Sequence, residues 1–178
     1  MMQHIQVERV LRETLQTPYR DLVTRSTGRA VRSSIQIALA SGQATLACLD
    51  FSFVGLVDFS CADEVVAKLL LDSPEGTFVL LQGLTEEQLV AIEYVLDRQA
   101  LAALVRDADT GRAWPVGRVG ADLQTAFAHL QRVGPSTAAT LAEHLGWGAA
   151  HTEDALEGLA RLRLVRADEG CYAIPLVT

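Results

Sequence analysis

Lysine is almost missing from this sequence of 178 residues, because Lys68 is the only lysine among 15 basic residues. Cysteine is scarce too. Cys48, Cys61 and Cys171 form no Cys-x-x-Cys pair, and an odd number of cysteines fits neither a disulfide framework nor a zinc site. No apolar run reaches the length of a membrane span, and the N-terminus lacks the apolar core of a secretory signal. We therefore expect a cytoplasmic protein that does not enter a membrane.

Positive charge is also in short supply over most of the chain. The formal net charge is −7, which argues against a protein that binds nucleic acid through a general positive coat. The first 43 residues are the exception, because six arginines there outnumber three acidic residues. They are Arg9, Arg12, Arg20, Arg25, Arg29 and Arg32. We expect a basic N-terminal surface that could receive an acidic partner.

Strands alternate with helices in the N-terminal two thirds, which predicts an α/β fold with a mostly parallel sheet covered by helices. Compact apolar runs predict buried strands at 44–51 and 76–84. Apolar residues at helical spacing predict helices at 24–41, 62–71 and 85–100.

The ends of these elements carry further signals. Gly42 is expected to end the first helix in the left-handed conformation. A hairpin or two short edge strands are predicted over 101–117, with Pro115 on an edge strand. Residues 4–11 fit either a short strand or the start of a helix.

The glycines of VGRVGAD mark a boundary, so we predict one domain over 1–117 and a second over 118–178. The second domain shows a helical pattern from Asp122, another that starts at Pro135 or Ser136, and a third over 149–164. A turn at DEG then joins two short alternating runs. Three helices followed by a β-hairpin are typical of a winged-helix domain.

The stretch LDFSFVGLVDFSCADE, Leu49 to Glu64, gathers most of the chemically interesting residues. We predict that Ser60 caps a helix there and that Asp63 and Glu64 complement the helix dipole. Cys61 would need a base to act as a nucleophile, and the neighbouring carboxylates oppose its thiolate. Adjacent acids on a helix point about 100° apart, so they cannot flank one substrate atom. No catalytic residue is predicted.

Two stretches, TRSTGRAVR (24–32) and LDFSFVGLVDFSCADEVVAKLL (49–70), resemble the STAS-like family of bacterial domains, relatives of the anti-sigma-factor antagonists. The resemblance covers Val7 to Arg112 and implies a small α/β sandwich that binds partner proteins. In signalling relatives, one partner is a kinase with a histidine-kinase-like ATPase fold, and phosphorylation of a Ser or Thr directly after an Asp switches binding. Here Phe59 follows Asp58, so the phosphorylation candidate moves to Ser60.

Residues that a protein partner would contact are predicted on two helices. Arg25, Arg29 and Arg32 share one helical face. This face either binds an acidic partner or is a solvated surface. The full set of candidates is Arg25, Arg29, Arg32, Phe59, Asp63 and Glu64.

The predicted recognition helix of the winged-helix domain starts with HTEDALEG, and the predicted wing contains Asp168 and Glu169. DNA affinity depends on phosphate neutralisation, so these acids favour protein contact or homodimerisation over DNA binding. His129, His144 and His151 lie in separate segments without ligand spacing, so no metal site is predicted.

These observations predict a non-enzymatic bacterial regulatory or signalling protein that acts by protein–protein interaction. The alternative is a DNA-binding transcriptional regulator that uses the winged helix. No cofactor is expected, because no glycine-rich phosphate loop and no set of nucleophile, base and orienting group are present.

Overall fold

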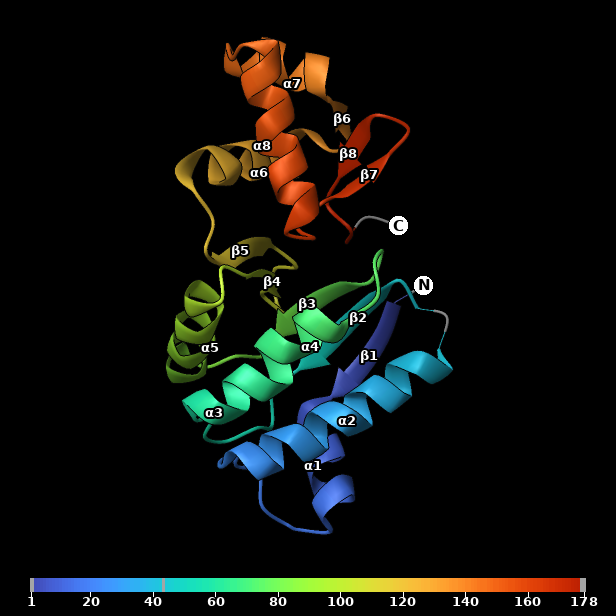
Figure 1. The fold of residues 1–178 in the computed structure, drawn as a ribbon, viewed down its shortest axis with the longest axis vertical. Helices are drawn as coiled ribbons and strands as arrows, with labels where there is room; N and C mark the ends of the chain where they lie inside the picture. The colour runs from blue at the N-terminus through green and yellow to red at the C-terminus, as the bar shows by residue number, and fades with distance from the viewer. Residues whose placement is uncertain (1, 43, 177–178) are drawn as a thin grey trace. The chain divides into compact units, whose positions relative to one another are not determined.

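The computed structural model describes residues 2–42 and 44–176 and divides into two compact units (Figure 1). The first unit is Met1–Arg118 and the second is Val119–Thr178. The division falls one residue after the boundary expected from the sequence, which was Gly117. Within the described residues, no helix combines the length and the apolar character needed to cross a bilayer.

A five-stranded, mostly parallel sheet forms the centre of the first unit. Its strands are β1 Met2–Gln6, β2 Leu46–Asp50, β3 Phe78–Gln82, β4 Ala102–Arg106 and β5 Ala113–Gly117. They lie in chain order, and only β5 runs antiparallel to its neighbour. Pro115 lies in β5, an edge strand, where a missing N–H is tolerated. The expected α/β class with a mostly parallel sheet is confirmed.

Helices connect the parallel strands of this unit. They are α1 Val7–Leu15, α2 Arg25–Ser41, α3 Phe59–Ala62, a π-helical segment η1 Asp63–Lys68, α4 Leu69–Asp72 and α5 Glu86–Arg98. Thr24 and Thr85 begin α2 and α5, because each side-chain oxygen accepts a backbone N–H of the first turn. The segments α3, η1 and α4 follow one another without a break.

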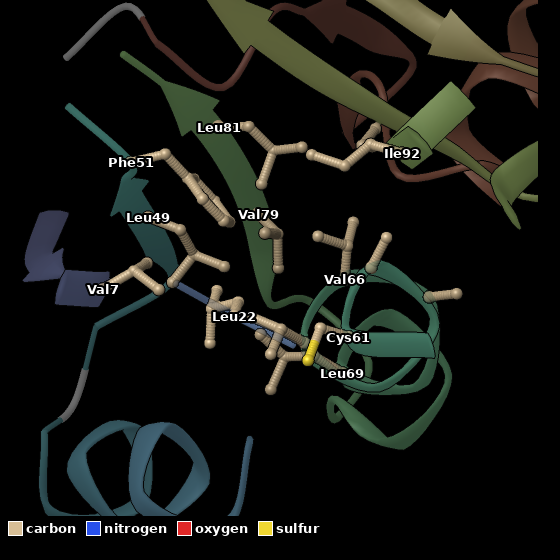
Figure 2. Close-up of a cluster of buried hydrophobic side chains, with 14 of the residues drawn as sticks. Val7, Leu22, Leu49, Phe51, Cys61, Val66, Leu69, Val79, Leu81 and Ile92 are labelled. Atoms are coloured by element: carbon tan, nitrogen blue, oxygen red, sulfur yellow. The ribbon is translucent and has the colours of Figure 1, made fainter. Parts of the chain in front are cut away.

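Side chains from these helices and from one face of the sheet share one hydrophobic core (Figure 2). The strand register places Ile5, Leu49, Leu81 and Val105 side by side across β1 to β4, all on that face. Apolar burial of this kind contributes roughly 25 cal/mol for each Å² removed from water, so this core is the main source of stability. It also holds the helices against this face of the sheet.

The second unit contains three helices of eight residues or more and a small antiparallel sheet. The helices are α6 Ala121–Val133, α7 Ala138–Leu145 and α8 Ala149–Arg161. The strands are β6 Ser136–Thr137, β7 Arg166–Asp168 and β8 Cys171–Ala173, in the order β6-β8-β7. Phe127, Leu130, Leu141, Leu156 and Leu159 are buried on the inner faces of the helices.

Three local expectations need correction. Gly42 is extended, with φ −101°, so it does not end α2 in the left-handed conformation. Residues 4–11 form both candidate elements, a strand that ends at Gln6 and a helix that begins at Val7. Helix α7 does not start at Pro135 or Ser136. The two residues of β6 pair with β8 first, and Thr137 then caps the helix.

Candidate functional site

The loop between β2 and α3 is held from two sides. The N–H of Leu22 donates to the carbonyl of Leu56 at 2.8 Å, and the carbonyl of Leu22 accepts from the N–H of Asp58 at 3.0 Å. From α5, the side chain of Gln88 donates to the carbonyl of Val54 at 2.9 Å. These hydrogen bonds position the start of α3 and the side chains there.

Asp58 caps α3 and accepts three hydrogen bonds. Its Oδ1 accepts from the N–H of Cys61 at 2.7 Å and from the hydroxyl of Ser60 at 2.8 Å, and its Oδ2 accepts from the N–H of Thr24 at 2.9 Å. Burial alone would raise the pKa of Asp58, but these donors favour the charged form and the pKa is lowered. The prediction of Ser60 as the N-cap is therefore wrong, because Asp58 holds that position and Ser60 lies in the first turn.

Cys61 is buried, and its thiol donates to the carbonyl of Thr24 at 3.0 Å. Burial, reinforced by the negative charge of Asp58, raises the pKa of the Cys61 thiol to about 12. A thiol in this environment stays protonated near neutral pH and is a poor nucleophile. Its observed role is packing between α2 and α3.

Glu64 is fully buried in η1 and lies among three cations. It accepts from Lys68 Nζ at 2.6 Å and from Arg25 Nη1 at 3.0 Å, and its Oε2 lies 3.2 Å from Arg32 Nη2. Burial on its own would raise the pKa of Glu64, but Lys68, Arg25 and Arg32 stabilise the carboxylate and the pKa is lowered. We call these four residues the buried ion cluster.

Gly28 lets α2 approach η1 closely enough to form the buried ion cluster. A Cβ atom at residue 28 would lie 3.0 Å from the Cα of Cys61 and 3.0 Å from the Cβ of Glu64. Because glycine leaves that space open, the arginines of α2 reach the carboxylate of η1. The π-helical turn at η1 is a rare conformation that is frequent at functional sites.

Arg25 links this cluster to the protein surface. Its Nη1 also donates to Asp63 at 2.7 Å, and its side chain is 46% exposed. Asp63 accepts a further hydrogen bond from the amide of Gln99, at the end of α5. The start of η1 is thus joined by polar contacts to both α2 and α5.

A surface cleft of about 400 Å³ lies beside the start of α3, with Arg25, Ser60, Asp63 and Gln99 among its lining residues. A further part of its lining is made by Phe59 and Tyr94, whose ring centroids are 4.8 Å apart at an interplanar angle of 55°. Phe59 and Tyr94 are 53% and 49% exposed, so this ring pair leaves apolar surface in contact with water.

Arg98 and Val95 also line the cleft. The guanidinium of Arg98 lies close to the Tyr94 ring. The guanidinium carbon lies 5.7 Å from the centroid of the Tyr94 ring, and Nη1 donates to the Tyr94 hydroxyl at 3.1 Å. Exposed Tyr, Phe and Arg side chains that are held in place are typical of residues that dominate protein–protein binding energy. We call Phe59, Tyr94 and Arg98 the aromatic–arginine surface.

The predicted partner residues are distributed unequally around the cleft. Arg25, Phe59 and Asp63 line it, as does the phosphorylation candidate Ser60. Glu64 is removed from the candidate set, because its buried carboxylate is not accessible to a partner. Arg32 is largely turned inward, since it contacts both Glu64 and Asp72. Arg29 is exposed but is not part of the cleft lining.

Sequence reasoning missed Tyr94, Arg98 and the capping role of Asp58. A signal for the first two was present in α5, where Val90, Tyr94 and Arg98 recur every four residues. They lie on the side of the helix opposite to the apolar residues Ile92, Val95 and Leu96. In the structure Val90 and Tyr94 are indeed exposed. The pairing of Tyr94 with Phe59 depends on packing between α3 and α5, which sequence spacing does not encode.

A second polar group lies at the carboxyl ends of the parallel strands. Asp50 accepts from the N–H of Ser52 at 2.9 Å and from Gln82 Nε2 at 3.2 Å, and it lies 3.3 Å from His4 Nε2. Burial would raise the pKa of Asp50, but hydrogen bonds from Ser52 and Gln82 lower it. Its acceptor sites are used within the fold, so we assign it a structural role.

In the second unit, the first turns of α8 present acids to solvent. Glu153, Asp154 and Glu157 are exposed, as are Asp168 and Glu169 around the β7–β8 turn. His129 and His144 are in contact at 3.1 Å, while His151 contacts the Trp147 ring. Over the described part of the chain, no group of three or more His, Cys, Asp or Glu residues is arranged to hold a metal ion.

Comparison with known proteins adds no assignment, because no family model matches the chain and no curated protein matches it significantly. The fold defines an α/β protein with a five-stranded, mostly parallel sheet and a separate helical unit. A functional proposal must therefore rest on the geometry of the cleft and its surroundings.

Proposed function

We propose that this chain is a non-enzymatic bacterial regulatory protein that binds a protein partner through its first unit. The observation that carries the proposal is the exposed ring pair of Phe59 and Tyr94 with Arg98 beside it. Leaving two contacting aromatic rings half in water costs free energy that a partner would recover by covering them. Cys61, the nucleophile candidate near the cleft, is buried and protonated, which weakens the case for an enzyme.

The STAS-like resemblance fits this proposal. It predicts a small α/β unit whose partner contacts the start of a helix after an Asp, and α3 starts at such an Asp58. A kinase with a histidine-kinase-like ATPase fold is then the class of partner to test first. Phe59 occupies the position of the family's phosphorylated residue, so we propose that it makes a permanent contact there.

Ser60 remains the candidate for phosphorylation. Its hydroxyl lines the cleft but donates to Asp58, so a phosphate on it would bring two more negative charges beside a carboxylate. Arg25 and Arg98 line the same cleft and would offset part of that repulsion. Phosphorylation would on this proposal weaken partner binding rather than create it.

We propose that the second unit is a winged-helix domain used for protein contact or homodimerisation. The order of elements supports this arrangement, because β6 lies between α6 and α7 and pairs with the β7–β8 hairpin that follows α8. The exposed acids of α8 would lie against phosphates in a DNA complex, so they disfavour the alternative of a transcriptional regulator. DNA binding that weakens steeply with salt and is lost with Arg161→Ala would favour that alternative instead.

Site-specific crosslinking in the source cell tests the main proposal. A photoreactive amino acid replaces Phe59 in one variant and Ile37 in another, since Ile37 is 71% exposed on α2 and is not a candidate contact. We expect a discrete protein adduct from position 59 that position 37 does not form. The same adduct from both positions, or none from position 59, would overturn the proposal.

A further inference from the structure

The geometry points to a carboxylate as the group that a partner segment places in the cleft, next to an apolar side chain that covers Phe59 and Tyr94. This inference rests on the proposed function and adds the chemistry of the partner.

The carboxylate and hydroxyl groups that line the cleft are already engaged. Asp63 accepts from Arg25 at 2.7 Å and from Gln99, and it lies 3.7 Å from Lys68 Nζ. The Ser60 hydroxyl is turned to Asp58, to which it donates at 2.8 Å. A cationic partner group would have to compete with these internal donors for the same oxygens.

The donors of the cleft are less fully used. Among the described residues, Arg98 forms no ion pair, and its hydrogen bond to the Tyr94 hydroxyl involves Nη1. Arg25 contacts both Asp63 and Glu64 through one nitrogen, Nη1. A guanidinium has five N–H donors in a planar fork that suits a carboxylate, so donor capacity remains on both arginines.

The acids near Arg98 do not fill this place. Asp97 is its neighbour in sequence, but Asp97 lies 3.4 Å from Arg118 instead. The ring of Tyr94 holds the guanidinium of Arg98 through a cation–π contact and a hydrogen bond, which limits its movement toward other acids. Arg98 is thus an exposed cation, positioned by an aromatic ring, at the edge of an apolar wall.

The size of the cleft limits the occupant. A volume of about 400 Å³ accommodates one or two side chains rather than a folded element. Aromatic walls with guanidinium groups at the rim match an Asp or Glu that is next to an aromatic or aliphatic residue. We therefore commit to a protein segment of that composition as the occupant.

Selection of displayed peptides tests this inference on the full-length protein. A random peptide library is panned against the wild-type chain and counter-selected against the Phe59→Ala/Tyr94→Ala variant, which retains peptides that need the aromatic wall. We expect the retained peptides to be enriched in Asp or Glu beside an apolar residue. Circular dichroism checks that the variant is folded. We expect that it is, because both side chains are half exposed.

A double-mutant cycle between the acid of one retained peptide and Arg98 measures the interaction between these two groups. Replacing the acid of the peptide with the matching amide is expected to weaken binding to the wild type about tenfold and to leave binding to Arg98→Gln nearly unchanged. Arg9→Gln is the matched control, because Arg9 is exposed on α1 and pairs with Glu13. This control should keep the wild-type affinity and the wild-type response to the amide.

Three results would overturn the inference while leaving the proposed function intact. The retained peptides could be basic or neutral. The peptide with the amide residue could bind as tightly as the peptide with the acid. The peptide could also bind only when phosphoserine replaces its acidic residue. Failure to retain any peptide that depends on Phe59 and Tyr94 would count against the proposed function itself, and the inference would fall with it.

Discussion

Gly28 of α2 lies directly against Glu64 of η1, so that a Cβ atom on residue 28 would come within 3.0 Å of the Glu64 Cβ. This contact brings the N-terminal half of α2 onto the π-helical segment. It is also the reason why the arginines of α2 reach a carboxylate that has no contact with water.

Gly28→Ala is expected to destabilise the first unit by about 1–3 kcal/mol, because the added methyl group forces α2 away from Cys61 and Glu64. Urea unfolding measures the free energy change. Ser33→Ala is the control, since Ser33 is exposed on the same helix and its substitution should have little effect. A Gly28→Ala variant as stable as the wild type would show that α2 and η1 pack less closely than described.

Glu64→Gln is expected to destabilise the first unit by roughly 3 kcal/mol, because it leaves Lys68, Arg25 and Arg32 close together with less negative charge between them. Glu13→Gln removes an exposed carboxylate from a pair with Arg9 and should cause no measurable change. Equal effects of the two substitutions would contradict the special role of the buried carboxylate.

The same carboxylate predicts how stability depends on pH. The pKa of Glu64 is lowered in the folded state, so its contribution is fully present above the unfolded-state pKa near 4.5 and is lost as pH falls through the folded-state value. The urea midpoint of the wild type should therefore fall on acidification below about pH 4.5. The Glu64→Gln profile should be flatter over that range, and parallel profiles would contradict the assignment.

His129 predicts a separate acid sensitivity in the second unit. Its Nδ1 lies 3.2 Å from Arg132 Nη2, which can only donate, so Nδ1 must accept and the proton must lie on Nε2, facing His144 Nδ1 at 3.1 Å. Burial, with Arg132 and His144, lowers the pKa of His129. The stability that this depressed pKa contributes is complete above about pH 6.5 and decreases as pH falls below it.

Amide hydrogen exchange of α6 and α7 measures this decrease in stability at low pH. We expect faster exchange at pH 5.5 than at pH 7.5, after correction for the intrinsic rate, in the wild type and in His151→Gln, since His151 is exposed. In His129→Gln the pH dependence should largely disappear. Retention of the full pH dependence in that variant would assign the effect to another group.

The cysteines provide a test by chemical labelling. Burial raises the pKa of Cys61 to about 12 and that of Cys48 to about 11, so both thiols stay protonated at pH 8. Cys171 is partly exposed in β8 and should react first with iodoacetamide, as measured by peptide mass spectrometry. Unfolding in urea should make all three reactive, and fast labelling of Cys61 in the folded protein would contradict its burial.

Local patterns in the sequence predicted much of the fold correctly. The apolar runs at β2 and β3 and the β4–β5 hairpin with Pro115 at the edge follow from interactions between residues close in sequence. The Ser60 cap was wrong because two neighbouring side chains, Asp58 and Ser60, could each cap the helix. Asp58 also accepts the backbone N–H of Thr24, a contact 34 residues away that the local pattern does not contain.

The sequence by itself determined the class of the protein: an acidic chain with an α/β first unit and a helical second unit, no membrane-length apolar run and no local catalytic motif. Only the tertiary structure decided which polar side chains are exposed. Glu64 and Arg25 look equivalent as surface charges along the chain, yet packing of Gly28 against η1 buries the first and leaves the second at the edge of the cleft. Packing of α3 against α5 likewise pairs Phe59 with Tyr94, because contacts between distant segments depend on the whole core rather than on local spacing.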